Sequence, residues 1–288
     1  MTALETVACP LCGARESAHL FRASGRAMTR CRECGLVYRN PRPSVDESTP
    51  DDAGDPREAE EDRWLAERRG VNFRRFLDAW TGPPGRLLDV GCGYGWFLEM
   101  AAKRGWEGVG VDRSPRAVRH ARDRLHLDAR CGDTQTIGFP DGAFSLVTLW
   151  NVLEFVPDPV GLLREVHRVL EPGGTLFLRT QNYFFQRLAF LLTGPFLSEL
   201  PYRTFVFHLN SFSPAPLRLL LRRSGFAELK MTNSRPTWGD PYRAFGAADR
   251  LVTAAKLGIH GLTQGLYFLS GRRWILGPSL EAYARREG

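Results

Sequence analysis

Long apolar runs are missing from this chain of 288 residues. No run of 18 apolar residues occurs, which excludes a typical membrane-spanning helix. Residues 1–6 also lack the basic and apolar regions of a secretion signal, so we expect a cytoplasmic protein. In that compartment thiols stay reduced, and we do not expect disulfide bonds among the six cysteines.

Lysine is also scarce, since only three of the 39 basic residues are lysines and the rest are arginines. The formal net charge of +7 hides a contrast along the chain. Residues 44–62 hold nine acidic residues and one basic residue, a net charge of −8, which predicts a solvated linker. The basic remainder could attract anionic partners, although nucleic acid is a less favoured partner than a small molecule.

Four of the six cysteines form two pairs, each with two residues between its members. Cys9 and Cys12 are the first pair, Cys31 and Cys34 the second, and 18 residues separate the pairs. This spacing fits a four-thiolate zinc site. A glycine follows each pair and allows a turn whose backbone N–H groups point at the sulfurs. Four sulfurs close the coordination shell, so we expect a structural zinc ion that replaces a larger core.

An apolar strand runs directly into three glycines within residues 86–95. Gly91, Gly93 and Gly95 stand at alternate positions and precede a predicted helix, which brings bare backbone close to a ligand. A dinucleotide-binding fingerprint needs its third glycine at position 96, where this chain has tryptophan. The pattern therefore disfavours NAD and FAD.

Further apolar segments follow the glycine turn and end at polar residues. Asp112 lies 21 residues after Gly91, a separation at which an acidic side chain can accept from both ribose hydroxyls. Later segments end at Asp133 and Asn151. Five strands alternating with helices predict a doubly wound parallel sheet, whose ligands belong at the carboxyl ends of the strands.

This pattern resembles motif I and the acidic loop of class I S-adenosylmethionine (SAM) dependent methyltransferases, over about residues 85–233. The resemblance implies a Rossmann-like, seven-stranded, mostly parallel sheet with an antiparallel strand at 279–285. It also implies that SAM is the cofactor. Asp89 would hold its methionine amino group, Asp112 its ribose and Asp133 its adenine. The full set of implied SAM-binding residues is Asp89, Gly91, Gly93, Gly95, Asp112, Asp133 and Asn151.

Residues 31–43 resemble a zinc-ribbon leader found ahead of many bacterial methyltransferases that act on small molecules or glycans. We therefore expect a zinc ribbon at 1–43, an acidic linker at 44–62 and a methyltransferase domain at 63–288. The expected reaction is methyl transfer to oxygen or carbon of a glycan, lipid or secondary-metabolite precursor. A ribosomal RNA methyltransferase is one alternative, because some carry a similar leader. A non-catalytic SAM-binding or zinc-ribbon interaction protein is another.

Two segments exceed what the minimal fold needs. Residues 182–207 are rich in phenylalanine and tyrosine, and residues 233–278 form a long insertion. Together they predict an acceptor pocket. Within the insertion, a stripe that includes Leu262 and Leu269 predicts a helix packed on the core, with a substrate lid, a dimer contact or a shallow membrane contact as alternatives.

The general base is harder to assign. The family's common pattern has a histidine at the place where this chain has Phe155. His208 is then the best remaining base, with a carboxylate such as Glu154 as the substitute.

Overall fold

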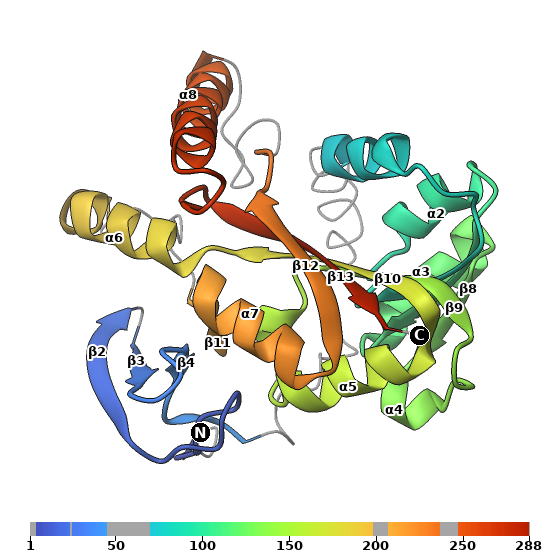
Figure 1. The fold of residues 1–288 in the computed structure, drawn as a ribbon, viewed down its shortest axis with the longest axis horizontal. Coiled ribbons are helices and arrows are strands. Elements are labelled where there is room, and N and C mark those ends of the chain that lie inside the picture. The colour runs from blue at the N-terminus through green and yellow to red at the C-terminus, as the bar shows by residue number, and fades with distance from the viewer. Residues whose placement is uncertain (1–3, 24, 45–69, 198–206, 237–246, 288) are drawn as a thin grey trace.

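A seven-stranded sheet forms the centre of the molecule (Figure 1). This computed structural model describes residues 4–23, 25–44, 70–197, 207–236 and 247–287. The acidic segment lies almost wholly outside these ranges. The strands of the sheet are β6 (Arg86–Val90), β7 (Glu107–Asp112), β8 (Asp128–Cys131), β9 (Phe144–Trp150), β10 (Leu170–Gln181), β12 (Phe226–Asn233) and β13 (Ser279–Arg286).

The strand order is β12-β13-β10-β9-β6-β7-β8. Strands β6 to β10 pair in parallel, while β13 runs antiparallel to both β10 and β12. The predicted fold class is confirmed, including the antiparallel strand at 279–285. Because the parallel strands end at one edge, residues that follow β6, β7, β8 and β9 lie along that edge.

Helices cover both faces of the sheet. Residues 70–79, α2 (Trp96–Ala102) and α3 (Pro115–Leu125) pack on one face, where Leu87 and Phe177 join their apolar cluster. On the other face α5 (Pro159–Val169) and α7 (Pro214–Arg223) pack against Leu88. Neighbouring residues of β6 thus face opposite layers, as expected for a strand buried on both sides.

The zinc-ribbon region forms its own small sheets beside this core. They contain β1 (Leu4–Glu5), β2 (Ser17–Ala23), β3 (Arg26–Cys31), β4 (Val37–Arg39) and β5 (Arg42–Pro43). The sheet order β11-β4-β3-β2 shows that β11 (Asn210–Ser211), from the later part of the chain, completes the ribbon's sheet. The N-terminal region therefore shares backbone hydrogen bonds with the part of the chain that forms the seven-stranded sheet.

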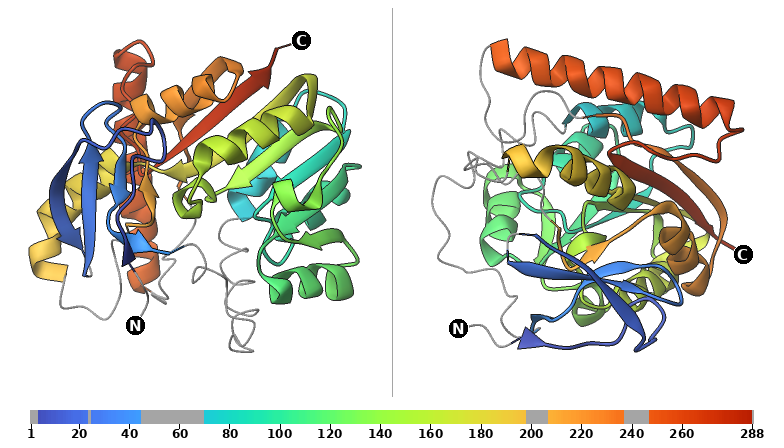
Figure 2. Two further views of the ribbon diagram at one scale, coloured as in Figure 1. Left: turned by 90° about the horizontal axis from the view of Figure 1, so that it is seen from below. Right: turned by 90° about the vertical axis from the view of Figure 1, so that its left-hand side faces the viewer.

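Two helices extend beyond the sheet, α6 (Tyr183–Leu197) and α8 (Ala247–Leu269). Both lie on the side of the molecule that faces the viewer in the right panel of Figure 2. Helix α8 occupies much of the insertion at 233–278. The expectation that Leu262 and Leu269 pack on the core is wrong, because they are 66% and 86% exposed.

Candidate functional site

The glycine turn after β6 leaves space beside its backbone. Gly93 has a φ of 53°, and a Cβ atom there would meet no other atom within 4 Å. Gly91 is different, because an added Cβ would lie 2.5 Å from Val152 Cγ2. Gly91 therefore allows tight packing beneath the turn, while Gly93 leaves open a cradle that a side chain would fill.

Asp112 ties the end of β7 to this turn. Its Oδ2 atom accepts a hydrogen bond from the Gly93 N–H at 2.8 Å, and its Oδ1 atom accepts from the Ser114 N–H at 2.9 Å. Each carboxylate oxygen can accept a second bond. The carboxylate can thus hold the turn and still accept from hydroxyl groups of a ligand.

Asp89 lies within β6 and is only 2% exposed. The Thr148 hydroxyl donates to its Oδ1 atom at 2.6 Å. Burial raises the pKa of Asp89 to about 7, although the Thr148 bond opposes this shift. An ionised carboxylate in this place gains most from a cationic ligand group.

Asp133 follows β8 and caps the short helix α4 (Thr134–Ile137). Its Oδ1 atom accepts from the Thr136 N–H at 2.8 Å. The residue is exposed. Its role toward adenine stays a prediction.

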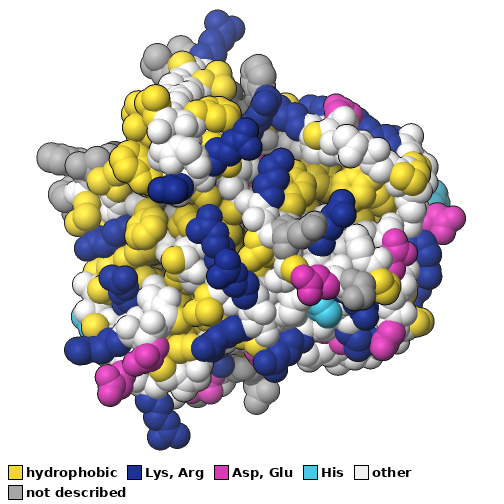
Figure 3. Space-filling model, in the orientation of Figure 1, with side chains coloured by type: hydrophobic (Ala, Val, Ile, Leu, Met, Phe, Trp, Pro, Cys, Tyr) yellow, Lys and Arg dark blue, Asp and Glu magenta, His cyan; other side chains and the backbone are white. Residues whose placement is uncertain are grey.

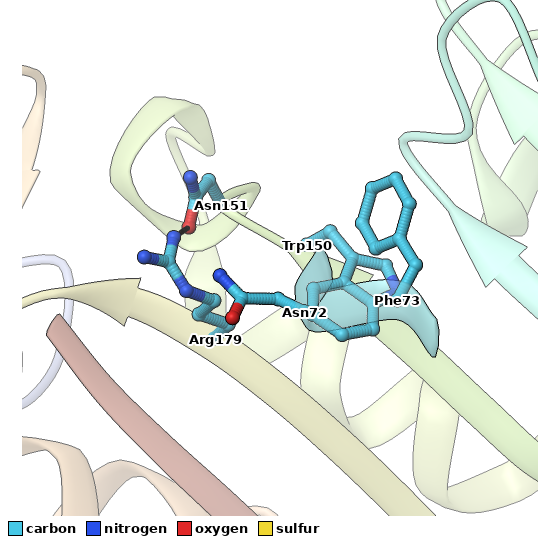
Figure 4. A pocket seen from close by; sticks show the side chains of 5 residues that line it. All are labelled: Asn72, Phe73, Trp150, Asn151 and Arg179. Atoms are coloured by element: carbon cyan, nitrogen blue, oxygen red, sulfur yellow. Dashed lines mark hydrogen bonds between the residues drawn. The ribbon is translucent and has the colours of Figure 1, made fainter. Parts of the chain in front are cut away.

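A pocket lies where β9 and β10 reach the carboxyl edge (Figure 4). Phe73 and Trp150 form aromatic walls, and Asn72 reaches in beside Arg179. The Asn72 Oδ1 atom is buried and has no hydrogen-bond partner among the described residues. Asn151, with a φ of 58°, accepts from Arg179 Nη1 at 2.7 Å through its Oδ1 atom. The pocket combines apolar walls with few polar groups, as binding sites for small molecules do.

Glu154 lies beside this edge in a short 3-10 helix (Leu153–Phe155) and is 2% exposed. Its Oε1 atom accepts from the Gln181 N–H at 3.3 Å, and its Oε2 atom has no partner among the described residues. Burial, opposed by hydrogen bonds and by Arg179, raises the pKa of Glu154. A carboxyl group with a raised pKa is a stronger base when it is ionised.

His208 lies against Phe155, the residue that replaces the family's histidine. The two ring centroids are 4.2 Å apart. Burial, and to a lesser degree the charge of Arg26, lower the pKa of His208 to about 4. The imidazole is therefore neutral at pH 7, as a base must be, but its basicity is weak.

The four ribbon cysteines come together as the spacing predicts. Their Sγ atoms lie within 4.8 Å of one another, and the Cys9–Cys34 and Cys12–Cys31 pairs are both 3.5 Å apart. Zinc–sulfur bonds of about 2.3 Å in a tetrahedron place sulfurs about 3.8 Å apart, so the cluster could hold a structural zinc ion.

Backbone N–H groups surround these sulfurs. The pKa of the Cys9 thiol is lowered first by its contact with Cys34, and also by hydrogen bonds from the Leu11 and Cys12 backbone. Such bonds favour the thiolate form that binds metal. The N–H groups inferred from the glycine after the first pair are therefore present.

Asn72, Phe73 and Arg179 line the pocket, although the sequence patterns do not predict them as site residues. Arg179 does carry a usable signal, because a charged residue at the end of a buried strand needs a partner or a ligand. Asn72 is a weaker indication of a site, because in the sequence it is only a single amide on the apolar face of a helix. None of the described residues of 182–197, 207, 233–236 or 247–278 lines this pocket.

Comparison with known proteins decides the family. A family model for a methyltransferase domain matches residues 63–230, more than half of the chain. The chain belongs to this methyltransferase family. A ubiquinone biosynthesis O-methyltransferase of Xanthomonas oryzae pv. oryzae is 32% identical over 165 residues, which cover 55% of this chain and 68% of that relative. The corresponding protein of Xanthomonas campestris pv. campestris is 31% identical over 168 residues, covering 56% and 69%.

Solved structures show the same fold. A SAM-dependent methyltransferase from Archaeoglobus fulgidus aligns with a TM-score of 0.52 at 18% identity, covering 81% of this chain and all of that one. Geranyl diphosphate C-methyltransferase from Streptomyces coelicolor aligns with a TM-score of 0.52 at 16% identity, covering 83% and 87%.

The methyltransferase uses SAM as its cofactor. The open cradle at Gly93 and the carboxylate of Asp112 beside it fit a nucleoside with free ribose hydroxyls. The enzyme class and the cofactor expected from the glycine turn are therefore confirmed.

Proposed function

We propose that this methyltransferase transfers the methyl group of SAM to an oxygen or carbon atom of a small molecule of the glycan, lipid or secondary-metabolite class. We favour oxygen in a lipid-like acceptor, because both relatives named above are ubiquinone biosynthesis O-methyltransferases. The pocket with Phe73 and Trp150 as walls carries this proposal, since aromatic surfaces suit an apolar acceptor.

When bound, SAM supplies an electrophilic methyl group. Residues of this chain then have three tasks, which are to bind the cofactor, orient the acceptor and keep water out. The backbone at Gly91, Gly93 and Gly95 and the carboxylate of Asp112 serve the first task. Asn72 and Arg179 orient polar atoms of the acceptor, and the pocket's aromatic walls exclude water.

An acceptor hydroxyl must also lose its proton. We propose His208 as the group that takes it, because its imidazole is neutral and lies against Phe155 at the family's histidine position. Glu154 is the alternative base. The two differ in pH dependence. If neutral His208 is the base, activity falls only as the pH drops toward 4. If ionised Glu154 is the base, its raised pKa makes activity fall at a pH above the ordinary pKa of a glutamate side chain.

The decisive experiment offers SAM and a panel of acceptors and detects methylated products by mass spectrometry. The panel holds a phenolic lipid, a hydroxylated glycan and ribosomal RNA. We expect a product with the phenolic lipid. Product formed from RNA alone, together with RNA binding that weakens steeply with salt, would favour the RNA alternative instead. SAM binding without any product would favour the non-catalytic alternative.

Matched variants test the sites. Gly93→Ala adds a methyl group to the cradle, and Gly173→Ala adds one at another open position with positive φ, on the opposite edge of the sheet. We expect only Gly93→Ala to weaken SAM binding, by about tenfold or more.

His208→Ala should lower turnover by about 10²-fold with SAM affinity nearly unchanged. His19→Ala, at an exposed position, should leave turnover unchanged. Equal turnover in the two histidine variants would exclude His208 as the base.

The division into a ribbon at 1–43, a linker at 44–62 and a catalytic domain at 63–288 also stays a proposal, as does a cytoplasmic location. None of the described helices is long and apolar enough to cross a membrane.

A further inference from the structure

Helix α8 turns apolar side chains toward solvent. Leu257, Leu262, Phe268 and Leu269 are between 53% and 86% exposed. Leu262, Phe268 and Leu269 follow Leu257 by 5, 11 and 12 positions, and at 100° per residue all four lie on one face of the helix, about 140° wide. On the same side, glycines at 258, 261 and 265 leave the helix surface open, with nothing within 4 Å of an added Cβ.

Beside the buried ring of Tyr267, the protein-facing side of α8 carries polar groups. Thr263 is buried there, and its carbonyl oxygen accepts from Asn233 Nδ2 at 3.2 Å. Gln264 Oε1 accepts from the same amide at 3.0 Å, and Tyr267 donates to the Met231 carbonyl oxygen at 3.4 Å. A surface helix of a globular protein normally has the reverse arrangement, with its apolar stripe inward. The exposed apolar stripe of α8 therefore requires a binding partner that removes it from water.

Helix α6 and the turn after α8 extend this apolar surface. Phe184, Leu188 and Leu191 occupy one face of α6 and are each more than half exposed. Trp274, just beyond α8, is 58% exposed. Figure 3 shows hydrophobic side chains gathered over both helices, with lysine and arginine side chains among them.

The charge of these segments is predominantly positive. From the start of α8 to residue 280 the chain contains Arg250, Lys256, Arg272 and Arg273 and one acidic residue, Asp249. Residues 183–197 contain one arginine and no acidic residue. Apolar and aromatic side chains interspersed with basic ones are typical of surfaces that lie on anionic bilayers.

We infer that the exposed faces of α6 and α8, with the turn at 270–276, form a docking surface for an anionic lipid membrane. The apolar side chains enter the boundary between headgroups and acyl chains, and Arg272 and Arg273 contact the phosphates beside Trp274. The chain lies on the bilayer and does not span it, in keeping with the hydropathy of its described helices. This surface does not depend on which acceptor is methylated.

A second copy of the chain fits the surface less well. A two-fold interface pairs each patch with itself. The basic residues of 247–280 would then meet one another, with Asp249 as the one acidic residue in that segment. An anionic bilayer complements the same charges.

Vesicle flotation with the full zinc-loaded chain tests the inference. Vesicles of phosphatidylcholine alone are compared with vesicles that also contain phosphatidylglycerol. We expect binding to the anionic vesicles that weakens with salt. The double variant Leu262→Gln with Phe268→Gln should reduce binding about tenfold or more, and Arg272→Gln with Arg273→Gln should do so at low salt. The matched control is Arg122→Gln with Arg124→Gln on α3, which removes the same charge from exposed positions and should bind as the unmodified chain does.

SAM affinity and the thermal midpoint of each variant establish that it is folded, since all six positions are exposed. The inference is overturned if the unmodified chain ignores anionic vesicles, or if the α8 leucine and phenylalanine variant still binds like it. It is also overturned if the α3 control loses as much binding as the Arg272 and Arg273 variant. A dimer in light scattering that the α8 variant dissolves, with no vesicle binding, would assign the surface to a second copy. None of these results bears on methyl transfer itself.

Discussion

Asp112 combines two tasks in one carboxylate. It holds the N–H groups of Gly93 and Ser114 and faces the open cradle. We expect Asp112→Ala to weaken SAM binding by about 1.5 to 3 kcal/mol, because charge-assisted bonds to the ribose hydroxyls are lost. Titration calorimetry measures this change. Asp123→Ala on the exposed surface of α3 is the control, and equal affinity in both variants would remove Asp112 from the site.

Asp89 makes stability depend on pH in an unusual direction for a carboxyl group. Its folded-state pKa, about 7, lies above its ordinary value of 3.8 because the side chain is buried. The folded state then binds more protons than the unfolded state between these values, so this contribution to stability is full below 3.8 and is lost as the pH rises through 7.

We therefore expect Asp89→Asn to change stability in a pH-dependent way. Relative to the unmodified chain without SAM, the variant should gain stability between pH 5 and pH 8, by at most about 3 kcal/mol. Chemical unfolding at both pH values measures the difference. The variant should also bind SAM more weakly, since the methionine amino group would lose the anionic partner that the family resemblance implies. A stability difference that is the same at both pH values would contradict the pKa shift.

At the scale of elements, the zinc ribbon connects directly to the acceptor side of the catalytic domain. Strand β4 pairs with β11, and the Arg39 N–H donates to the Leu209 carbonyl oxygen at 2.9 Å, next to His208. Phe21 of β2 packs against Phe207 with ring centroids 4.9 Å apart. A zinc ion held by the four cysteines would therefore support the segment that carries the proposed base.

Metal removal should act on this segment before it acts on SAM binding. One zinc per chain is expected by metal analysis, and Cys31→Ser should lower that content, because it removes one of four ligands. After chelation, hydrogen exchange should rise in residues 25–40 and 207–213 while SAM affinity persists. The control is Cys131→Ser, an exposed thiol outside the cluster. Full zinc content in Cys31→Ser would contradict the ligand assignment.

Elements that depend on interactions between residues near in sequence can be predicted from the sequence, whereas elements that depend on pairing with distant residues cannot. The strand at 86–90 and the turn at Gly91 are visible because buried runs and glycines are local signals. Strand β11 is not, because two residues paired to a distant strand leave no periodicity. For α8 the spacing of Leu262 and Leu269 predicts a helix correctly but assigns the wrong face, since an apolar stripe does not say what covers it. Arg179 joins the site through tertiary contacts with Asn151, Ser234 and Ser279.

At the scale of the whole molecule, the ribbon and the sheet share one core. Cys9, Leu36 and Tyr38 belong to the same apolar cluster as Leu88 and Leu149. Polar contacts add to this continuity, since an arginine of β5 donates to the Pro157 carbonyl oxygen and one of α7 donates to the Leu11 carbonyl oxygen. A leader built in this way differs from a domain on a free tether, because its unfolding exposes part of the larger core.

We therefore expect the zinc-loaded chain to unfold in one calorimetric transition, whose calorimetric and van't Hoff enthalpies agree. Chelation should lower the midpoint of the whole transition, because the catalytic domain loses the apolar cover that Leu36 and Tyr38 provide. Saturating SAM should raise the midpoint whether or not metal is present, as about 2.7 kcal/mol of stabilisation accompanies ligand at a hundredfold excess over its Kd. Two separate transitions, of which chelation moves only the smaller, would mean that the shared core and β11 do not couple ribbon and sheet energetically.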